Sequence, residues 1–354
     1  MNAIHLDGAN ASDVASLIAL AGANSERWRK IMTQLPSIAC CAVLLSLAGA
    51  SPAAEDAYPS RRITIIIPFG TGGATDLLAR LLAQKMSVSM NQTIVVENHP
   101  GAGGSIGSLE VARAPANGYT LLLGTSSTHG INPWIYKLPY DVTKDFAPIT
   151  MVATTEYALS VNPKFNPGVA SIRDLINLAK TRRTTYASTG NGTTSHLGAA
   201  LFAKISKTDF VHIPYKSQAP AQIDLLGGQV DFMIDNVSTV LPQAKAEKLR
   251  ILATAGRART AVTPDIPTLI EAGVPDYEIV GWFVLFAPAG TPEPIVNTLN
   301  AEAVKALNLP DVRERMLADG NTPFPATPAE TKVYLASQLA RFKKVVDAAG
   351  ARLD

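Results

Sequence analysis

The sequence predicts an α/β protein with two lobes and a cleft between them. Its 354 residues exceed what one hydrophobic core usually serves, so two lobes are the default expectation. From residue 62 onward, apolar runs with turn signals alternate with helical patterns, which indicates βαβ units and mostly parallel sheets. Two long apolar segments, 149–161 and 277–287, are placed to cross between the lobes and form a hinge.

The first block of the chain alternates strands with helices that have apolar residues at helical spacing. We predict strands at 63–68, 93–97 and 119–123 and helices at 77–86 and 106–112. With the C-terminal part of the chain, this block is predicted to form one lobe, residues 58–155 plus 280–354.

The second block has enough alternating elements to be a lobe of its own, residues 156–279. We predict helices at 171–180, 197–205 and 219–226 and strands at 184–187, 210–213, 230–234 and 249–255.

The chain then ends in a helix with clear local signals. Thr327 to Glu330 form a capping box with proline at the first helical position, and Gly350 is placed to stop the helix.

The balance of charge favours neither a nucleic acid nor a charged membrane surface as a partner. The chain has 47% hydrophobic and 17% charged residues, and its 31 basic and 29 acidic side chains leave a formal net charge of +2. That charge is too small to indicate a nucleic-acid-binding surface or electrostatic attachment to a membrane. No nucleic-acid partner is therefore expected.

Residues 1–54 have the layout of a non-structural N-terminus followed by a secretory signal peptide. The apolar run 38–50 follows Arg27, Arg29 and Lys30 and ends in small residues. It is shorter than the roughly 20 apolar residues that a membrane-spanning helix needs, and a retained signal anchor is the alternative. We expect cleavage near Ala50 or Ala54 and an exported mature chain.

Both cysteines, Cys40 and Cys41, lie inside that apolar run. Cleavage would leave a mature chain without cysteine, which excludes a thiol enzyme and a metal site built on cysteine. Lipidation is not expected, because a lipoprotein cysteine should end the apolar run rather than lie near its start.

Four loops rich in glycine, serine and threonine follow predicted strands, at 69–76, 124–129, 188–196 and 235–239. Open parallel sheets bind ligands beyond the carboxyl ends of their strands. Backbone N–H groups at helix starts and hydroxyl groups favour an anion, and glycines let the backbone approach it closely. The four loops together predict a cleft that holds a carboxylate without an arginine.

Each loop taken alone can also be a simple turn. Asp76 is more typical of the first turn of a helix than of a ligand contact. His129 and His196 are expected to make hydrogen bonds within their loops, because no cluster of His, Asp and Glu has metal-site spacing. We expect neither a metal nor a cofactor.

Two enzyme motifs are present only in part. The Gly-x-Gly-Gly run at 70–73, with Glu97 further on, resembles a dinucleotide fingerprint, but Thr75 stands where glycine is needed. The residues around Ser105 match a nucleophile elbow, but residues 98–104 separate this serine from its strand. A Rossmann-type oxidoreductase and a serine hydrolase are the enzyme alternatives; we expect neither, and no catalytic residue.

Seven motifs occur in order from about residue 58 to the C-terminus. They are IPFG-x-GG-x-x-D at 67–76, VEN-x-PGAGG at 96–104, NGYTLL at 117–122, YAS with GNG and HL at 186–197, IPYK at 213–216, LGGQVD at 226–231 and APAGTP at 287–292. Together they resemble the periplasmic solute receptors of tripartite tricarboxylate transporters, also called Bug proteins. One departure is Ser217, where the family often has glycine.

The resemblance implies an α/β, two-lobed type II periplasmic-binding-protein fold, with a hinge of crossing strands and an interlobe cleft that closes on a small carboxylate. It implies a periplasmic location and, as partners, the membrane subunits of a tripartite transporter. The ligand contacts that it implies are Phe69, Gly72, Gly73, Thr75, Asp76, Ser126, Ser127, Thr128, Thr189, Asn191, Thr193, Ser195, His196 and Asp235.

The sequence leaves the ligand and the downstream partner open. Citrate, dicarboxylates, acidic amino acids and aromatic acids all suit such loops. A monomeric receptor that delivers a carboxylate to a transporter is the main hypothesis. A receptor that hands its closed form to a signalling system is the alternative.

Overall fold

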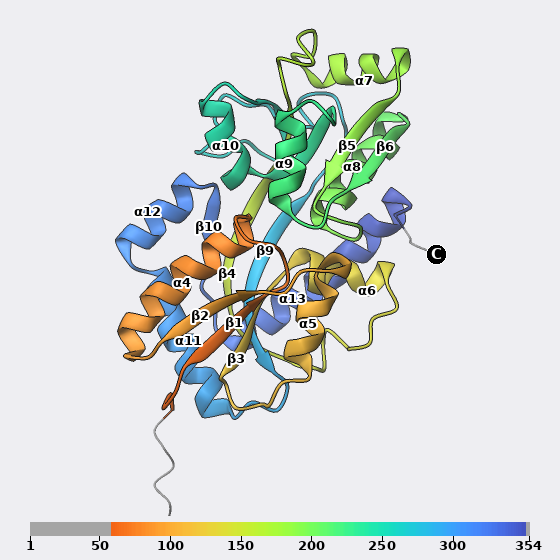
Figure 1. Cartoon of the computed structure of the whole chain (residues 1–354). Helices are drawn as coiled ribbons and strands as arrows, with labels where there is room; N and C mark the ends of the chain where they lie inside the picture. The colour runs from red at the N-terminus through yellow and green to blue at the C-terminus, as the bar shows by residue number, and fades with distance from the viewer. Residues whose placement is uncertain (1–57, 352–354) are drawn as a thin grey trace, which may run out of the picture. The chain divides into compact units, whose positions relative to one another are not determined.

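Ten strands form one mixed sheet in residues 58–351, the part of the chain that this computed structural model describes (Figure 1). The strands are β1 (Ile63–Ile67), β2 (Ile94–Asn98), β3 (Thr120–Thr125), β4 (Phe146–Val161), β5 (Thr184–Ser188), β6 (Phe210–Pro214), β7 (Phe232–Asn236), β8 (Arg250–Thr254), β9 (Val280–Pro288) and β10 (Asn321–Pro323). Their order is β2-β1-β3-β9-β4-β7-β5-β6, and β8 and β10 both pair with β4.

The sheet is parallel only towards its two ends. Strand β1 pairs in parallel with β2 and β3, and β5 pairs in parallel with β6 and β7. The central pairs β3–β9, β9–β4 and β4–β7 are antiparallel. The predicted predominance of parallel pairing is wrong at the centre, because β4 and β9 carry the chain across the molecule in opposite directions.

Strands β4 and β9 join two lobes. We call the elements around β1, β2 and β3 the first lobe, and those around β5, β6 and β7 the second lobe. Strand β4 pairs with β9 from Phe146 to Glu156, and then with β7 from Tyr157 to Val161. The two segments predicted to cross between the lobes are therefore strands, although the exact lobe boundaries at 155–156 and 279–280 stay a prediction.

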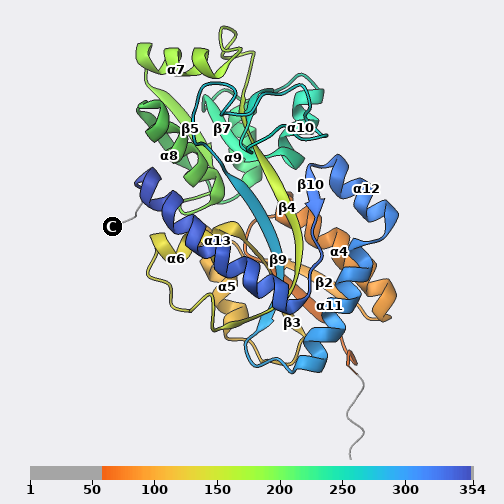
Figure 2. The same cartoon turned by 180° about the vertical axis from the view of Figure 1, so that it is seen from behind.

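Helices cover both lobes, and one of them lies across the back of the molecule. They are α4 (Ala74–Met90), η1 (Ala102–Gly104), α5 (Ser105–Ala112), η2 (Ser126–Ile131), α6 (Asn132–Ile135), α7 (Ile172–Thr181), α8 (Thr194–Ser206), α9 (Gln218–Leu226), α10 (Val237–Lys245), α11 (Glu293–Leu307), α12 (Pro310–Ala318) and α13 (Pro328–Ala349). Figure 2 shows α13 running along the rear face, where it contacts η2 and α8. The predicted α/β class is confirmed.

The ends of α13 follow the local signals of its sequence. The Thr327 hydroxyl accepts from the Glu330 amide, and the Glu330 carboxylate accepts from the Thr327 amide, which is the predicted capping box. Gly350 ends the helix with a φ of 64°, a conformation that glycine adopts without strain. Phe342 and Val346, on the buried face, join a core that also contains Phe286.

The predicted signal peptide and both cysteines lie outside the described residues. Within residues 58–351, no helix combines the length and the apolar character that crossing a membrane would need.

Candidate functional site

A cavity of about 40 Å³ lies where the four predicted loops meet the crossing strands. Its lining comes from both lobes and from the hinge: Phe69, Gly70, Gly73, Thr75, Thr125, Ser126, Ser127, Thr155, Tyr157, Thr189, Gln218, Asn236, Trp282 and Phe283. Six of the predicted contacts therefore line it: Phe69, Gly73, Thr75, Ser126, Ser127 and Thr189. None of the lining side chains carries a charge at neutral pH.

Asp76 lies in the first turn of α4 and shapes the loop without lining the cavity. Its carboxylate accepts hydrogen bonds from the Gly72 amide at 3.0 Å, from the Asn98 side chain at 3.0 Å and from Arg80. Burial opposes ionisation of Asp76, but these donors and the Arg80 charge outweigh it and lower the pKa of the carboxyl. Gly72, with a φ of 78°, makes the turn that lets the backbone reach Asp76.

The loop after β3 bonds directly to the second lobe. The hydroxyls of Ser126 and Ser127 lie 2.9 and 3.1 Å from the Thr194 hydroxyl, and the Thr194 amide donates to Ser127 at 3.0 Å. Thr128 instead turns inward, where its hydroxyl bonds to the Thr125 backbone and to Nδ1 of His129. Ser126 and Ser127 thus close the cleft, whereas Thr128 stabilises the loop.

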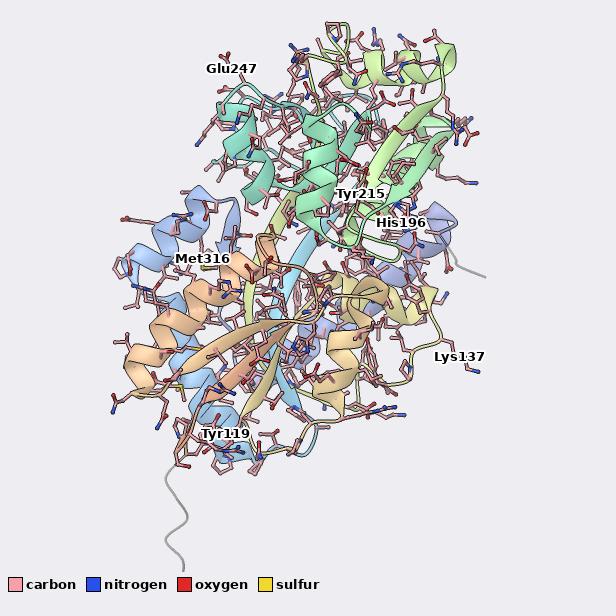
Figure 3. All side chains as sticks on the ribbon, viewed as in Figure 1. Tyr119, Lys137, His196, Tyr215, Glu247 and Met316 are labelled. Atoms are coloured by element: carbon pink, nitrogen blue, oxygen red, sulfur yellow. The ribbon has the colours of Figure 1, made fainter. Side chains whose placement is uncertain are left out.

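In the loop after β5, most of the residues predicted to contact the ligand make hydrogen bonds within the protein instead. The Thr193 hydroxyl caps α8, and Ser195 donates to the Ile234 carbonyl at 2.6 Å. Nδ1 of His196 accepts from the Gly192 amide at 3.3 Å, and its ring stacks on His212. Figure 3 shows His196 on the side of the second lobe that faces the first lobe.

Asn191 closes the cleft through its backbone. Its carbonyl accepts a hydrogen bond of 2.8 Å from the hydroxyl of Tyr136, which belongs to the first lobe. Thr189, two residues earlier, lines the cavity.

Asp235 is fully buried behind the cavity and orients two residues that line it. Its carboxylate accepts from Gln218 Nε2 at 2.6 Å and from the Asn236 amide at 2.8 Å. Burial raises the pKa of Asp235 to about 6, against the effect of these donors. Gln218 Oε1 in turn accepts from the Ala74 amide of the first lobe at 3.0 Å, so this chain of hydrogen bonds crosses the cleft.

The sequence did not predict that the hinge strands and α9 contribute residues to the lining of the cavity. Thr155 and Tyr157 on β4, and Trp282 and Phe283 on β9, form one wall of the cavity. The indole N–H of Trp282 is buried and has no hydrogen-bond partner among the described residues. The apolar character of both strands predicts only crossings between the lobes, and the polar residues within them are the available signal for a role in the site.

The sequence did not predict that Gln218 lines the cavity. The residue before it, Ser217, stands where the family often has glycine. A Cβ on Gly70 would lie 2.6 Å from Cβ of Ser217, so glycine at 70 allows the two loops to touch. The position of Gln218 at the first turn of α9 directs its amide into the cleft.

The cavity offers hydroxyl, amide and indole groups, a set that suits a carboxylate. Hydroxyls and amides donate hydrogen bonds to carboxylate oxygens, and an enclosed site strengthens such bonds because water is excluded. Within residues 58–351, no group of three or more His, Cys, Asp and Glu side chains could hold a metal ion.

Ser105, the residue of the hydrolase alternative, is buried at the start of α5, where it bonds to the Asn132 side chain at 3.3 Å. It does not line the cavity. We expect Ser105→Ala to keep the ligand affinity of the parent protein within about twofold, because no bond of Ser105 reaches the cleft. Calorimetric titration of both proteins checks this, and a tenfold loss of affinity would contradict it.

Comparisons with known proteins agree with this architecture. The model of the tripartite tricarboxylate transporter family receptor matches residues 78–351. Protein BugT of Bordetella pertussis is 38% identical over 328 residues, which are 91% of this chain and 99% of BugT. The R. palustris protein Rpa4515, solved with adipate, is 35% identical with a TM-score of 0.80 and covers 84% of this chain and 100% of its own.

MatC from Rhodopseudomonas palustris, solved with bound malate, is 33% identical with a TM-score of 0.77. The match covers 82% of this chain and 100% of MatC. These likenesses confirm the predicted periplasmic-binding-protein fold. The chain belongs to the receptor family of the tripartite tricarboxylate transporters.

Proposed function

We propose that this chain captures a small carboxylate in the cavity between its lobes and that closure of the lobes holds it there. The carboxylate accepts hydrogen bonds from the loops that start α4 and η2 and from the indole of Trp282, while Gln218 lines the cavity and ties the two lobes together. The predicted contacts that lie outside the lining, namely Gly72, Asp76, Thr128, Asn191, Thr193, Ser195, His196 and Asp235, position the lining and the lobes rather than touch the ligand.

The observation that carries this proposal is the set of hydrogen bonds across the cleft. Ser126 and Ser127 bond to Thr194, Gln218 bonds to the Ala74 amide, and Tyr136 bonds to the Asn191 backbone. A ligand that contacts both lobes favours the arrangement in which these bonds form, and such differential binding is what shifts a hinge equilibrium.

Two relatives support a carboxylate as the ligand. Structures of related R. palustris proteins hold adipate and malate, both of which are dicarboxylates. The uncharged lining suits such an anion, because neutral donors can bind it without a paired buried cation.

We further propose that the mature chain is a periplasmic monomer whose signal peptide is removed near Ala50 or Ala54. It delivers its ligand to the membrane subunits of a tripartite transporter. Binding of the ligand-loaded protein to membranes that contain those subunits, and not to membranes without them, tests this step.

Thermal unfolding with a carboxylate panel tests the proposed binding. In protein freed of ligand by unfolding and refolding, a carboxylate at 1,000 times its Kd should stabilise the native state by about 4 kcal/mol. A panel without any such shift would disprove the proposal.

The Ser127→Ala variant tests the place of binding. Loss of the Ser127 hydroxyl leaves the Thr194 amide without its acceptor across the cleft. This destabilises the arrangement of the lobes that holds the ligand by about 1–3 kcal/mol, so binding should weaken roughly tenfold. Ser160→Ala is the matched control, since the buried Ser160 hydroxyl has no partner among the described residues and lies outside the cavity lining. Equal affinities of the two variants would contradict binding in this cavity.

A further inference from the structure

Another cavity, of about 210 Å³, lies along the hinge strand β4, and we call it the hinge cavity. Strand β10 pairs with β4 at residues 153–155 and β8 pairs with β4 at residues 158–161, so Glu156 lies at the break between the two pairings (Figure 2). The walls come from β4, from the loop after β8, and from α12 and β10. Only Thr155 also lines the first cavity, so the hinge cavity is a separate site.

Glu156 brings a buried carboxylate into the lining of the hinge cavity. Its Oε2 accepts hydrogen bonds from the hydroxyls of Thr260 at 2.9 Å and of Thr263 at 3.5 Å, and so holds the loop after β8. Among residues 58–351, no hydrogen bond or ion pair reaches its Oε1. A Cβ on Gly256, which also lines the cavity, would lie 3.3 Å from Oε1, so this oxygen lies against the lining. One carboxylate oxygen is therefore left to accept from a ligand.

Asn321 adds a second acceptor from the neighbouring strand. It lies opposite Thr155, the residue before Glu156, and it lines the hinge cavity. Asn321 is only 5% exposed, and its buried Oδ1 has no hydrogen-bond partner among the described residues. A buried acceptor without a donor is unfavourable, and a ligand that donates to it would remove that cost.

The charge of Glu156 has no paired cation in the described part of the chain. Arg257 also lines the cavity, but its guanidinium donates to Glu278 at 2.6 Å and its side chain is 79% exposed. Burial raises the pKa of Glu156, although the Thr260 hydroxyl opposes this effect. A ligand that carries a positive charge would offset the loss of water around this carboxylate.

The volume and the walls of the hinge cavity suit an organic cation. In residues 58–351, no group of three or more His, Cys, Asp and Glu side chains could hold a metal ion. Val262, Val280 and Leu317 give the lining an apolar part. A cavity of about 150 Å³ already holds benzene, so 210 Å³ accommodates a short carbon chain. A primary ammonium group supplies three N–H donors together with a positive charge.

We propose that the hinge cavity binds a small primary ammonium compound. Its N–H groups donate to Oε1 of Glu156 and to Oδ1 of Asn321, and its carbon chain packs against Leu317 and the two valines. This site is separate from the carboxylate cavity, and its occupation does not depend on the proposed receptor function.

Calorimetric titration of the ligand-free protein with three matched probes tests this assignment. The probes are n-butylammonium, n-butyltrimethylammonium and n-butanol. The trimethyl compound keeps the charge but has no N–H donor, and the alcohol has a donor but no charge. n-Butylammonium should bind saturably at one site, and at least about tenfold more tightly than either of the other two.

Two variants and one control locate the binding. Glu156→Gln removes the charge but keeps an oxygen for the Thr260 hydroxyl, and it should bind n-butylammonium at least about tenfold more weakly. Asn321→Ala removes an acceptor that has no partner in the protein, so it should fold as the parent does and lose about fivefold in affinity. Glu247→Gln removes an exposed carboxylate at the outer end of the second lobe (Figure 3) and should bind as the parent does.

The outcomes separate the ammonium site from the carboxylate receptor. Absence of saturable n-butylammonium binding, equal binding of the three probes, or parent-like affinity in Asn321→Ala overturns the hinge-cavity site. Asn321→Ala keeps the test decisive if thermal unfolding shows that Glu156→Gln does not fold. Binding of n-butylammonium with the expected losses, by protein that binds no carboxylate, supports the hinge-cavity site and overturns only the proposed receptor function.

Discussion

Replacing Gln218 with alanine is expected to lower the affinity for the bound carboxylate by ten- to hundredfold. The Gln218 side chain lines the cavity and accepts from the Ala74 amide across the cleft at 3.0 Å. Its Nε2 donates at 2.6 Å to both Asp235 and Thr239. Truncation leaves a buried amide and a buried carboxylate short of partners, at about 1–3 kcal/mol for each unmade bond.

Gln222→Ala is the matched control for that experiment. Gln222 lies on the same helix and donates to the same carboxylate at 3.2 Å, but it does not line the cavity, and among the described residues it has no hydrogen bond to the first lobe. We expect its affinity to stay within threefold of the parent, measured by calorimetric titration with the same carboxylate. Equal losses in the two variants would mean that Gln218 acts only by supporting Asp235.

The free energy of unfolding is expected to fall sharply when the ligand-free protein is taken from pH 7 to pH 5. Burial lowers the pKa of His129 to about 3, of His196 to about 4 and of His212 to about 3. Each of these histidines is neutral in the native state but gains a proton on unfolding once the pH falls below about 6.5. His129 alone should therefore cost about 2 kcal/mol by pH 5, and the other two act in the same direction.

Asp235 opposes this trend. Its native pKa of about 6 exceeds the unfolded value of about 4, so on acidification the native carboxyl is protonated before the unfolded one, and the native state gains stability as the pH falls through this range. By pH 5 this gain is about 1 kcal/mol, less than the loss from His129 alone. Net destabilisation on acidification is the expected result.

Urea unfolding at pH 7, 6 and 5 measures these free energies, and His129→Phe isolates one contribution. Phenylalanine keeps the aromatic contact with Phe286, whose ring centroid lies 4.3 Å from that of His129, but cannot titrate. The loss between pH 7 and pH 5 should shrink by about 2 kcal/mol in this variant.

Phe146→Leu is the control, because Phe146 packs edge-on against His129 and does not titrate. It should lower stability at every pH and leave the pH dependence unchanged. An unchanged pH dependence in His129→Phe would contradict the assignment.

The sequence by itself determined the elements whose signals are local. Apolar periodicity, the capping box at Thr327 and the stop at Gly350 placed helices, and the loops after β1, β3, β5 and β7 were found because glycine and hydroxyl residues follow apolar runs. These features depend on neighbours within a few residues, and so does each of the motifs that identified the family.

Only the tertiary structure decided which of the loop residues face the cavity. Asp76 and Asp235 are carboxylates in ligand-binding loops, but their partners Asn98 and Gln218 lie 22 and 17 residues away and hold both away from the lining. The hinge residues Trp282 and Tyr157 reach the site because β4 and β9 cross beneath it. Local pattern carries no information on such distant pairings, since it is the packing of the whole sheet that selects them.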